Sequence, residues 1–163
     1  VSAVVVSTVL MLLYVWFRFK DVRFGASSVA ALVHDVLVVL AFYAAARVSV
    51  GNTFIACMLT IVGYSINATI VIFDRIRENL KIHRRSESMT EMVDNSIWQT
   101  MGRSIYTVGT SLFAVVAIFI WGGETIRNFS FAMLVGFSSG AYTSTFLAGP
   151  LWMMLRKLKP GRD

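Results

Sequence analysis

Long apolar stretches separated by short charged segments are the feature that most constrains the fold of this chain. A helix needs about 20 mostly apolar residues to cross the hydrocarbon core of a bilayer. Five stretches qualify as spans, and they are residues 1–17, 26–46, 53–73, 104–122 and 129–155. We therefore expect an all-α membrane protein in which residues 1–155 form a bundle of five transmembrane helices.

Composition supports a membrane protein and argues against other classes. Hydrophobic residues make up 56% of the 163 residues and charged residues only 15%, whereas about 25% of the residues in a soluble domain are charged. The net charge of +6 does not indicate nucleic-acid binding, because the basic residues flank apolar segments and form no basic face with interleaved aromatics. Cys57 stands alone, so neither a disulfide framework nor a metal site is predicted, and no cofactor is expected.

The positions of Lys and Arg predict how the chain is oriented in the membrane. Thirteen of the 15 basic residues fall in segment 18–25, loop 74–103 and a tail at 156–163, and the opposite side has only Arg47 and Arg127. By the positive-inside rule, the side with thirteen is cytoplasmic, the C-terminal tail included. No charged region precedes the first apolar run, so we expect no signal peptide and interpret the chain as part of a longer protein.

Most connections between the expected spans are short. Residues 48–52 form a tight turn, and residues around 122–124 join the last two spans. The sizeable loop covers residues 74–103, where Ser88 and Glu91 form a capping-box pattern ahead of an apolar face. This pattern predicts either a short amphipathic helix near the membrane surface or a solvated connector.

Asp35 is the most unusual polar residue of the expected spans. It lies about ten residues into the second span, roughly 15 Å deep, where an ionised carboxylate costs at least ~2.5–3.5 kcal/mol. Asp35 is therefore either a proton- or ion-handling carboxylate, or a structural acid hydrogen-bonded to a neighbouring helix. His34 precedes it, and the two side chains need not meet, because adjacent helical residues point about 100° apart. His34 is either a proton shuttle or, as we favour, a polar packing residue.

The third span has polar residues that are typical of helix packing. Ser65 and Thr69 share one helical face at four-residue spacing, and Asn67 lies elsewhere on the helix. Asn67 can hydrogen-bond across a helix interface for about 0.6–2 kcal/mol. The charged run at 74–78 then marks the point where the helix leaves the membrane, with Arg75 able to pair with acidic residues on either side.

Arg103 stands where the fourth span begins. Its guanidinium either snorkels outward to phosphate headgroups or turns inward toward a carboxylate, for which Asp35 is the candidate in this chain. In the fifth span, Pro150 predicts that the helix either kinks or leaves the membrane early. This span also has small residues at four-residue spacing, which predict close packing against another helix: Gly136, Gly140, Ser144 and Ala148.

Residues 63–79 read GYSINATIVIFDRIREN. This run resembles the signature of the SecF family, the SecF subunits of the bacterial Sec protein-export machinery, and departs from it at one position. The pair His34-Asp35 and the run at 102–104 also resemble the family's corresponding helices, so the resemblance covers the whole chain. The residues that we assign to the motif are Tyr64, Ser65, Asn67, Ala68, Thr69, Phe73, Asp74, Arg75, Arg77 and Glu78.

The resemblance implies a role in transport and no catalytic activity. SecF subunits pair with SecD, both belong to the RND transporter superfamily, and together they assist export of unfolded preproteins through the SecYEG channel with an ion gradient. The implied fold is an RND-type bundle that forms half of a pseudo-symmetric assembly in the lipid of the bacterial inner membrane. The five spans of this chain would then correspond to helices two to six of the family.

Ala68 is the departure from the family pattern, which usually has Asp at that position. The resemblance implies that this Asp takes part in ion coupling with an Arg that matches Arg103. Either coupling in this chain uses Asp35 and a carboxylate from SecD, or the chain is a structural subunit that stabilises SecD and the channel without carrying ions. Another RND-superfamily exporter is a further alternative, although it would need a longer chain and a different signature.

Overall fold

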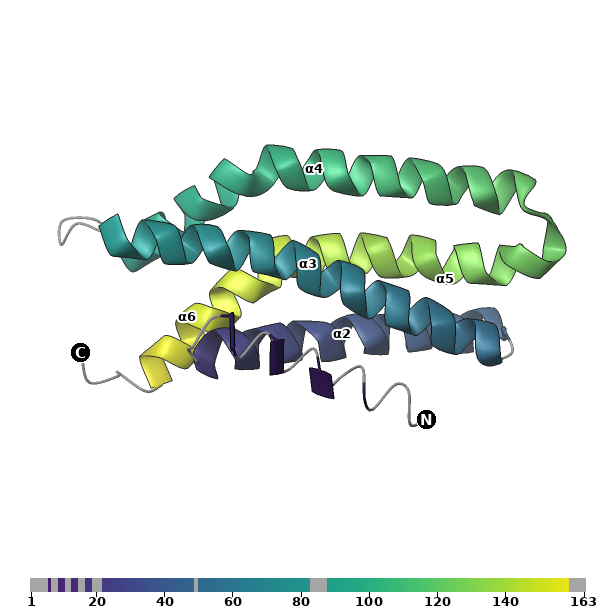
Figure 1. Cartoon of the computed structure of the whole chain (residues 1–163), viewed down its shortest axis with the longest axis horizontal. Coiled ribbons are helices and arrows are strands. Elements are labelled where there is room, and N and C mark those ends of the chain that lie inside the picture. The colour runs from purple at the N-terminus through teal and green to yellow at the C-terminus, as the bar shows by residue number, and fades with distance from the viewer. Residues whose placement is uncertain are drawn as a thin grey trace.

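The structure is a computed structural model that describes residues 6, 9–10, 13–14, 17–18, 22–48, 50–82 and 88–158. All the regular elements of this described part are helical (Figure 1). This confirms the expected all-α class. The elements are α2 (Val22–Ala46), α3 (Asn52–Ile82), α4 (Met89–Trp121), α5 (Gly123–Tyr142), the π-helix η1 (Thr143–Leu147) and α6 (Ala148–Leu158).

Four helical segments of the described residues are long and apolar enough to cross a membrane. They are Arg23–Ala46, Asn52–Ile82, Met89–Trp121 and Ile126–Lys157. The sequence predicts five spans, and the described residues contain four of sufficient length. Most of the first expected span, residues 1–17, lies outside the described residues, as do residues 159–163 of the expected tail.

Most of the expected loop 74–103 is helical. Helix α3 continues to Ile82, and α4 begins at Met89. The expectation of a separate surface helix before a fourth span at residue 104 is wrong, because α4 runs unbroken from Met89 to Trp121. These residues include no Pro, and an isolated glycine within a helix costs only about 1 kcal/mol relative to Ala.

The start of α4 is the capping box expected from the sequence. The Ser88 Oγ accepts a hydrogen bond from the Glu91 N–H at 3.2 Å, and the Glu91 carboxylate accepts one from the Ser88 N–H at 3.0 Å. Two backbone donors that a helix start leaves without partners are thus satisfied. Helix α4 therefore begins at a position that local sequence determines.

The connections from α2 to α3 and from α4 to α5 are short, as expected. After α2, Arg47 adopts φ 52°, and the Val48 N–H donates to the Tyr43 carbonyl at 3.2 Å. Between α4 and α5, Gly123 adopts φ 74°, a left-handed conformation that favours glycine. A Cβ at Gly122 would overlap the Ile118 carbonyl oxygen. Helix α5 consequently returns alongside α4 (Figure 1).

The bundle bends at the end of α5, where Figure 1 shows α6 leaving obliquely. The π-helical residues Thr143–Leu147 lie directly ahead of Pro150. Proline lacks an N–H and its ring clashes with the carbonyl four residues earlier, and a π-bulge is a common cause of a kink. The kink predicted from Pro150 is confirmed, and it places the η1 backbone beside α2 and α3.

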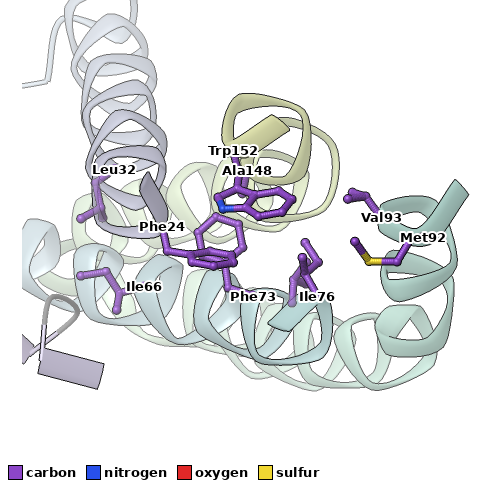
Figure 2. Close-up of a cluster of buried hydrophobic side chains, with 10 residues drawn as sticks. Phe24, Leu32, Ile66, Phe73, Ile76, Met92, Val93, Ala148 and Trp152 are labelled. Carbon is purple, nitrogen blue, oxygen red and sulfur yellow. The ribbon is translucent and has the colours of Figure 1, made fainter. Parts of the chain in front are cut away.

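Two clusters of buried side chains hold the helices together. In the first, Phe24 stacks on Trp152 with ring centroids 4.9 Å apart and meets Phe73 edge-on at 5.0 Å, so that α2, α3 and α6 are joined (Figure 2). The second includes Val39, Ile61 and Phe137 of α2, α3 and α5. In lipid, contact packing rather than burial from water provides most of this stability.

Candidate functional site: a buried carboxylate between four helical elements

Along α2, Asp35 lies between Leu32 of the first cluster and Val39 of the second, and its side chain is fully buried. Its carboxylate accepts hydrogen bonds from three hydroxyl groups. Ser139 Oγ donates to Oδ1 at 2.8 Å, Thr143 Oγ1 donates to the same oxygen at 2.7 Å, and Ser65 Oγ donates to Oδ2. The carboxylate of α2 thus joins α3, α5 and η1.

Glycines of α5 allow the helices to come this close. A Cβ at Gly140 would lie 3.3 Å from the Ser65 Cβ and 3.6 Å from Asp35 Oδ2, and a Cβ at Gly136 would overlap the Ile61 side chain. The small-residue face expected from the sequence is therefore confirmed as a close-packing face. Because Ser139 and Thr143 are close to Gly140 in the chain, the close approach of Gly140 to Asp35 leaves both hydroxyls within hydrogen-bonding distance of the carboxylate.

His34 reaches the same cluster. Its Nδ1 lies 3.0 Å from Thr143 Oγ1 and 3.5 Å from Asp35 Oδ1, and its side chain is 43% exposed. A hydroxyl has a single hydrogen. When Thr143 donates this hydrogen to Asp35, its oxygen can accept only from a protonated His34 Nδ1. The three residues then form a hydrogen-bonded chain from an accessible imidazole to a buried carboxylate.

The hydroxyl set around Asp35 suits both protonation states of the carboxyl group. An ionised carboxylate accepts from all three hydroxyls, whereas a protonated carboxylic acid has one donor of its own. Because a hydroxyl both donates and accepts, one of the three can rotate and accept the acid proton. An exclusively donating partner such as Lys or Arg would not allow this change.

Arg103 and Asn67 lie apart from this cluster. Together with Ala68, they line a second feature, a cavity of about 110 Å³ between α3, α4 and the region of α5 and η1. Among the described residues, the Arg103 guanidinium makes no hydrogen bond or ion pair, so the inward pairing with Asp35, one of the two alternatives left open by the sequence, is not present there. The candidate residues thus divide into two places, one built on Asp35 and His34 and the other on Arg103 and Asn67.

Ser139 and Thr143 were not among the candidates expected from the sequence. Their four-residue spacing places them on one helical face, next to the small residues of α5. That spacing indicates a shared face, but it does not show that the two hydroxyls turn toward Asp35. The expected shared face of Ser65 and Thr69 is confirmed, since both are buried and Asn67 is exposed.

The charged and polar residues at the C-terminal end of the motif connect α3 to α4 and to Arg18. Arg75 donates to Glu78 Oε2 and to Gln99 Oε1, both at 2.6 Å, and Asn79 donates to Ser96 Oγ at 2.8 Å. These bonds connect α3 to the first turns of α4. Asp74 pairs with Arg18 at 2.8 Å. Exposed pairs of this kind contribute about 0–1 kcal/mol each, so they orient the helix ends more than they stabilise them.

These features define a class, a multi-pass helical membrane protein with a polar cluster inside its bundle. Comparison with known proteins identifies the family. Residues 1–158 match the family model described as "Protein export membrane protein SecD/SecF, C-terminal". The chain belongs to this family.

Curated relatives agree with this assignment. The chain is 60% identical over 157 residues to the "Protein translocase subunit SecF" of Acidaminococcus fermentans, a match that covers 96% of this chain and 53% of that protein. It is 49% identical over 158 residues to the protein of the same name from Alicyclobacillus acidocaldarius, a match that covers 96% of this chain and 51% of that protein. The chain thus spans about half the length of these relatives.

A solved structure supports the fold. The crystal structure described as SecDF in the super-membrane-facing form is 41% identical to this chain and superposes with a TM-score of 0.85. The match covers 91% of this chain and 20% of that chain. The helical arrangement described above is therefore similar to a part of SecDF.

Proposed function

We propose that the chain belongs to a SecF subunit of the protein translocase, which acts with a SecD partner on preproteins in the SecYEG channel of the bacterial inner membrane. Its family and its relatives named as translocase subunits support this role. In this proposal, residues 1–17 supply a fifth helix, and residues 1–155 form one half of an RND-type assembly. The loop between α3 and α4 and the tail 156–163 face the cytoplasm.

Asp35 is the group that we propose to carry a proton in this subunit. The observation behind this proposal is the fully buried carboxylate, joined through Thr143 to the half-exposed His34. A proton that reaches His34 passes along the Thr143 hydroxyl to Asp35. Intramembrane carboxylates of this kind commonly mark proton relays.

Protonation of Asp35 would also change the contacts between helices. The ionised carboxylate holds hydroxyls of α3, α5 and η1, and the neutral acid must reverse one of these hydrogen bonds. A charge-assisted hydrogen bond is roughly twice as strong as a neutral one, so protonation loosens the junction. Loosening at each proton transfer would link the ion gradient to helix movement.

A second function, an uncoupled structural subunit, is favoured by one observation. Ala68 cannot titrate, although the family resemblance leads us to expect a carboxylate at this position. In that case Asp35 would only join the helices, and its hydrogen bonds would serve packing.

Gradient-stimulated export from vesicles separates the two functions. The vesicles contain full-length protein with SecD and SecYEG, and Asp35→Asn is compared with Glu124→Gln. Glu124 is an exposed acidic residue in the first turn of α5, at the other end of that helix from Ser139. If Asp35 carries the proton, Asp35→Asn assembles with SecD but loses the gradient response, whereas Glu124→Gln keeps it. Full stimulation in Asp35→Asn would establish the structural role. A response gained only in Ala68→Asp would show that the given chain is uncoupled.

A further inference from the structure

We infer that η1 is a hinge that couples the charge of Asp35 to the position of α6. The inference rests on the proposed function, in which Asp35 takes up a proton, and it names the part of the molecule that moves when this happens. Thr143 links the two, since η1 begins at this residue and its hydroxyl donates to Asp35 Oδ1 at 2.7 Å.

The backbone of η1 forms a turn that is wider than a turn of α-helix. The Ala148 N–H donates to the carbonyl of Thr143, five residues earlier, whereas an α-helix bonds each N–H to the carbonyl four residues earlier. This wide turn therefore contains one extra residue, and such turns are rare in proteins but frequent at functional sites. Because Thr143 is fully buried and supplies this carbonyl, the wide turn begins at the residue that is bonded to Asp35.

The junction between η1 and α6 lacks a backbone hydrogen bond. Pro150 has no N–H, so it can donate neither to the carbonyl four residues earlier nor to the one five residues earlier. Sharp bends in helices occur at such prolines and at wide turns of this kind. The backbone therefore holds α6 to α5 less firmly than a continuous helix would.

The charge of Asp35 determines how firmly η1 is held. A hydrogen bond to an ionised carboxylate is roughly twice as strong as a neutral one, so protonation weakens the bond that restrains Thr143. Within the described residues, His34 is the titratable group that contacts Asp35, and α3, α5 and η1 contribute hydroxyl groups to it. A change of charge on Asp35 is thus transmitted to η1 through a hydroxyl of its first residue.

Release of Thr143 would allow η1 to relax toward an α-helix. In a complete change, Ala148 advances by one residue position, which is about 100° around the helix axis and about 1.5 Å along it. Helix α6 begins at Ala148, so α6 as a whole would turn relative to α5.

A turn of α6 would change the packing where α3 ends and α4 begins (Figure 1). Trp152 of α6 is buried and stacks on Phe24 of α2 with ring centroids 4.9 Å apart (Figure 2). On the side of α4, a Cβ at Gly149 would lie 3.2 Å from the Val93 side chain. The position of α6 therefore decides how these helices meet at that end of the bundle.

Distances between spin labels test the hinge in the full-length protein in vesicles, with its native cysteines, Cys57 included, replaced by serine. One pair of labels, Glu124→Cys with Met154→Cys, joins exposed positions on opposite sides of η1. The matched control, Glu124→Cys with Ser138→Cys, lies within α5. We expect the first distance to shift on acidification, and by the same amount in Asp35→Asn at neutral pH, while the control distance stays unchanged.

Further variants connect the shift to η1. Deletion of Phe146, an exposed residue of the wide turn, places Ala148 four residues after Thr143, so the same N–H and carbonyl form an α-helical bond. The first distance should then no longer respond to Asp35→Asn. Thr143→Val should shift this distance at neutral pH, whereas Ser65→Ala, which removes a hydroxyl of α3 from Asp35, should not.

A first distance that is unchanged in Asp35→Asn would overturn the inference and show that η1 only accommodates Pro150. An undiminished response after deletion of Phe146, or equal shifts in Thr143→Val and Ser65→Ala, would also contradict it. If the deletion variant does not fold, the comparison of Thr143→Val with Ser65→Ala decides. A shift in Asp35→Asn without one on acidification would support the hinge and count against proton uptake by Asp35, so failure of the proposed function is recognised separately.

Discussion

Asp35 illustrates how one residue imposes order on several helices. A carboxyl group in an apolar bundle must have all its hydrogen-bonding capacity met, since unpaired buried polar groups are costly. Ser65, Ser139 and Thr143 meet it from three different elements. The carboxylate thus fixes how α2 is rotated relative to α3 and α5.

Removal of one hydroxyl donor should weaken this junction. We expect Ser139→Ala to destabilise the full-length protein by about 0.6–2 kcal/mol, the range measured for hydrogen bonds between membrane helices. The neighbouring Ser138 is exposed, so Ser138→Ala should leave stability unchanged. Unfolding of both variants in mixed detergent micelles measures the difference. Equal stability of the two variants would show that the Ser139 hydrogen bond contributes nothing.

Asp35 could be predicted as a site residue, but its partners could not. A carboxylate in an apolar span stands out in any sequence, whereas a serine or threonine in a helix can satisfy itself. Ser28 and Thr60, for example, donate to the carbonyls four residues earlier. Which hydroxyl turns toward a neighbour depends on helix rotation, which local sequence does not determine. For the same reason, the sequence could not show that Arg103 and Asp35 lie at different places in the bundle.

At the scale of the helices, α5 and α3 can make close contact because α5 has glycines, which have no side chain, at the contact. Gly136 and Gly140 lie directly against Ile61 and Ser65. The spacing of small residues was sufficient to predict this face, because a small residue at every fourth position recurs on one side of a helix. The unbroken α4 was not predicted, because polarity suggested a boundary at residue 104 where the backbone has none.

Enlargement of the glycine face should separate the helices. Gly136→Ala introduces a methyl group where the Ile61 side chain lies, and overpacking of this kind costs about 1–3 kcal/mol. Gly109→Ala in α4 is the control, because its Cβ would meet nothing within 4 Å, and it should stabilise the helix slightly. Thermal unfolding compares them, and Ile61→Val should partly rescue Gly136→Ala. A Gly136→Ala variant as stable as the parent would contradict the close packing.

The capping box makes a prediction for the start of α4. Ser88→Ala removes the side-chain acceptor for the Glu91 N–H, and loss of an N-cap costs about 0.5–2 kcal/mol. We expect faster hydrogen exchange at the first amides of α4 and no change in α5. Thr90→Ala alters an exposed side chain next to Glu91 that takes no part in this bond and should leave exchange as it is. Unchanged exchange in Ser88→Ala would mean that the cap does not hold the helix start.

At the scale of the whole molecule, the bundle is unevenly covered. Only 6% of the residues in the apolar window of α4 are buried within the described structure, compared with 39% in α3. Lipid can solvate such a surface, and so can a membrane partner. Since the chain spans about half the length of its relatives and 20% of its SecDF neighbour, a partner surface along α4 agrees with the proposed role.

Difference infrared spectroscopy of the full-length protein tests most directly whether Asp35 takes up a proton. Spectra recorded in vesicles at low and high pH report the carbonyl stretch of a protonated carboxylic acid. We predict a band that appears on acidification, disappears in Asp35→Asn, and shifts in Thr143→Val because a hydrogen-bond partner is lost. Spectra without any band that depends on Asp35 would contradict the proposed proton transfer and leave this carboxylate as a packing residue.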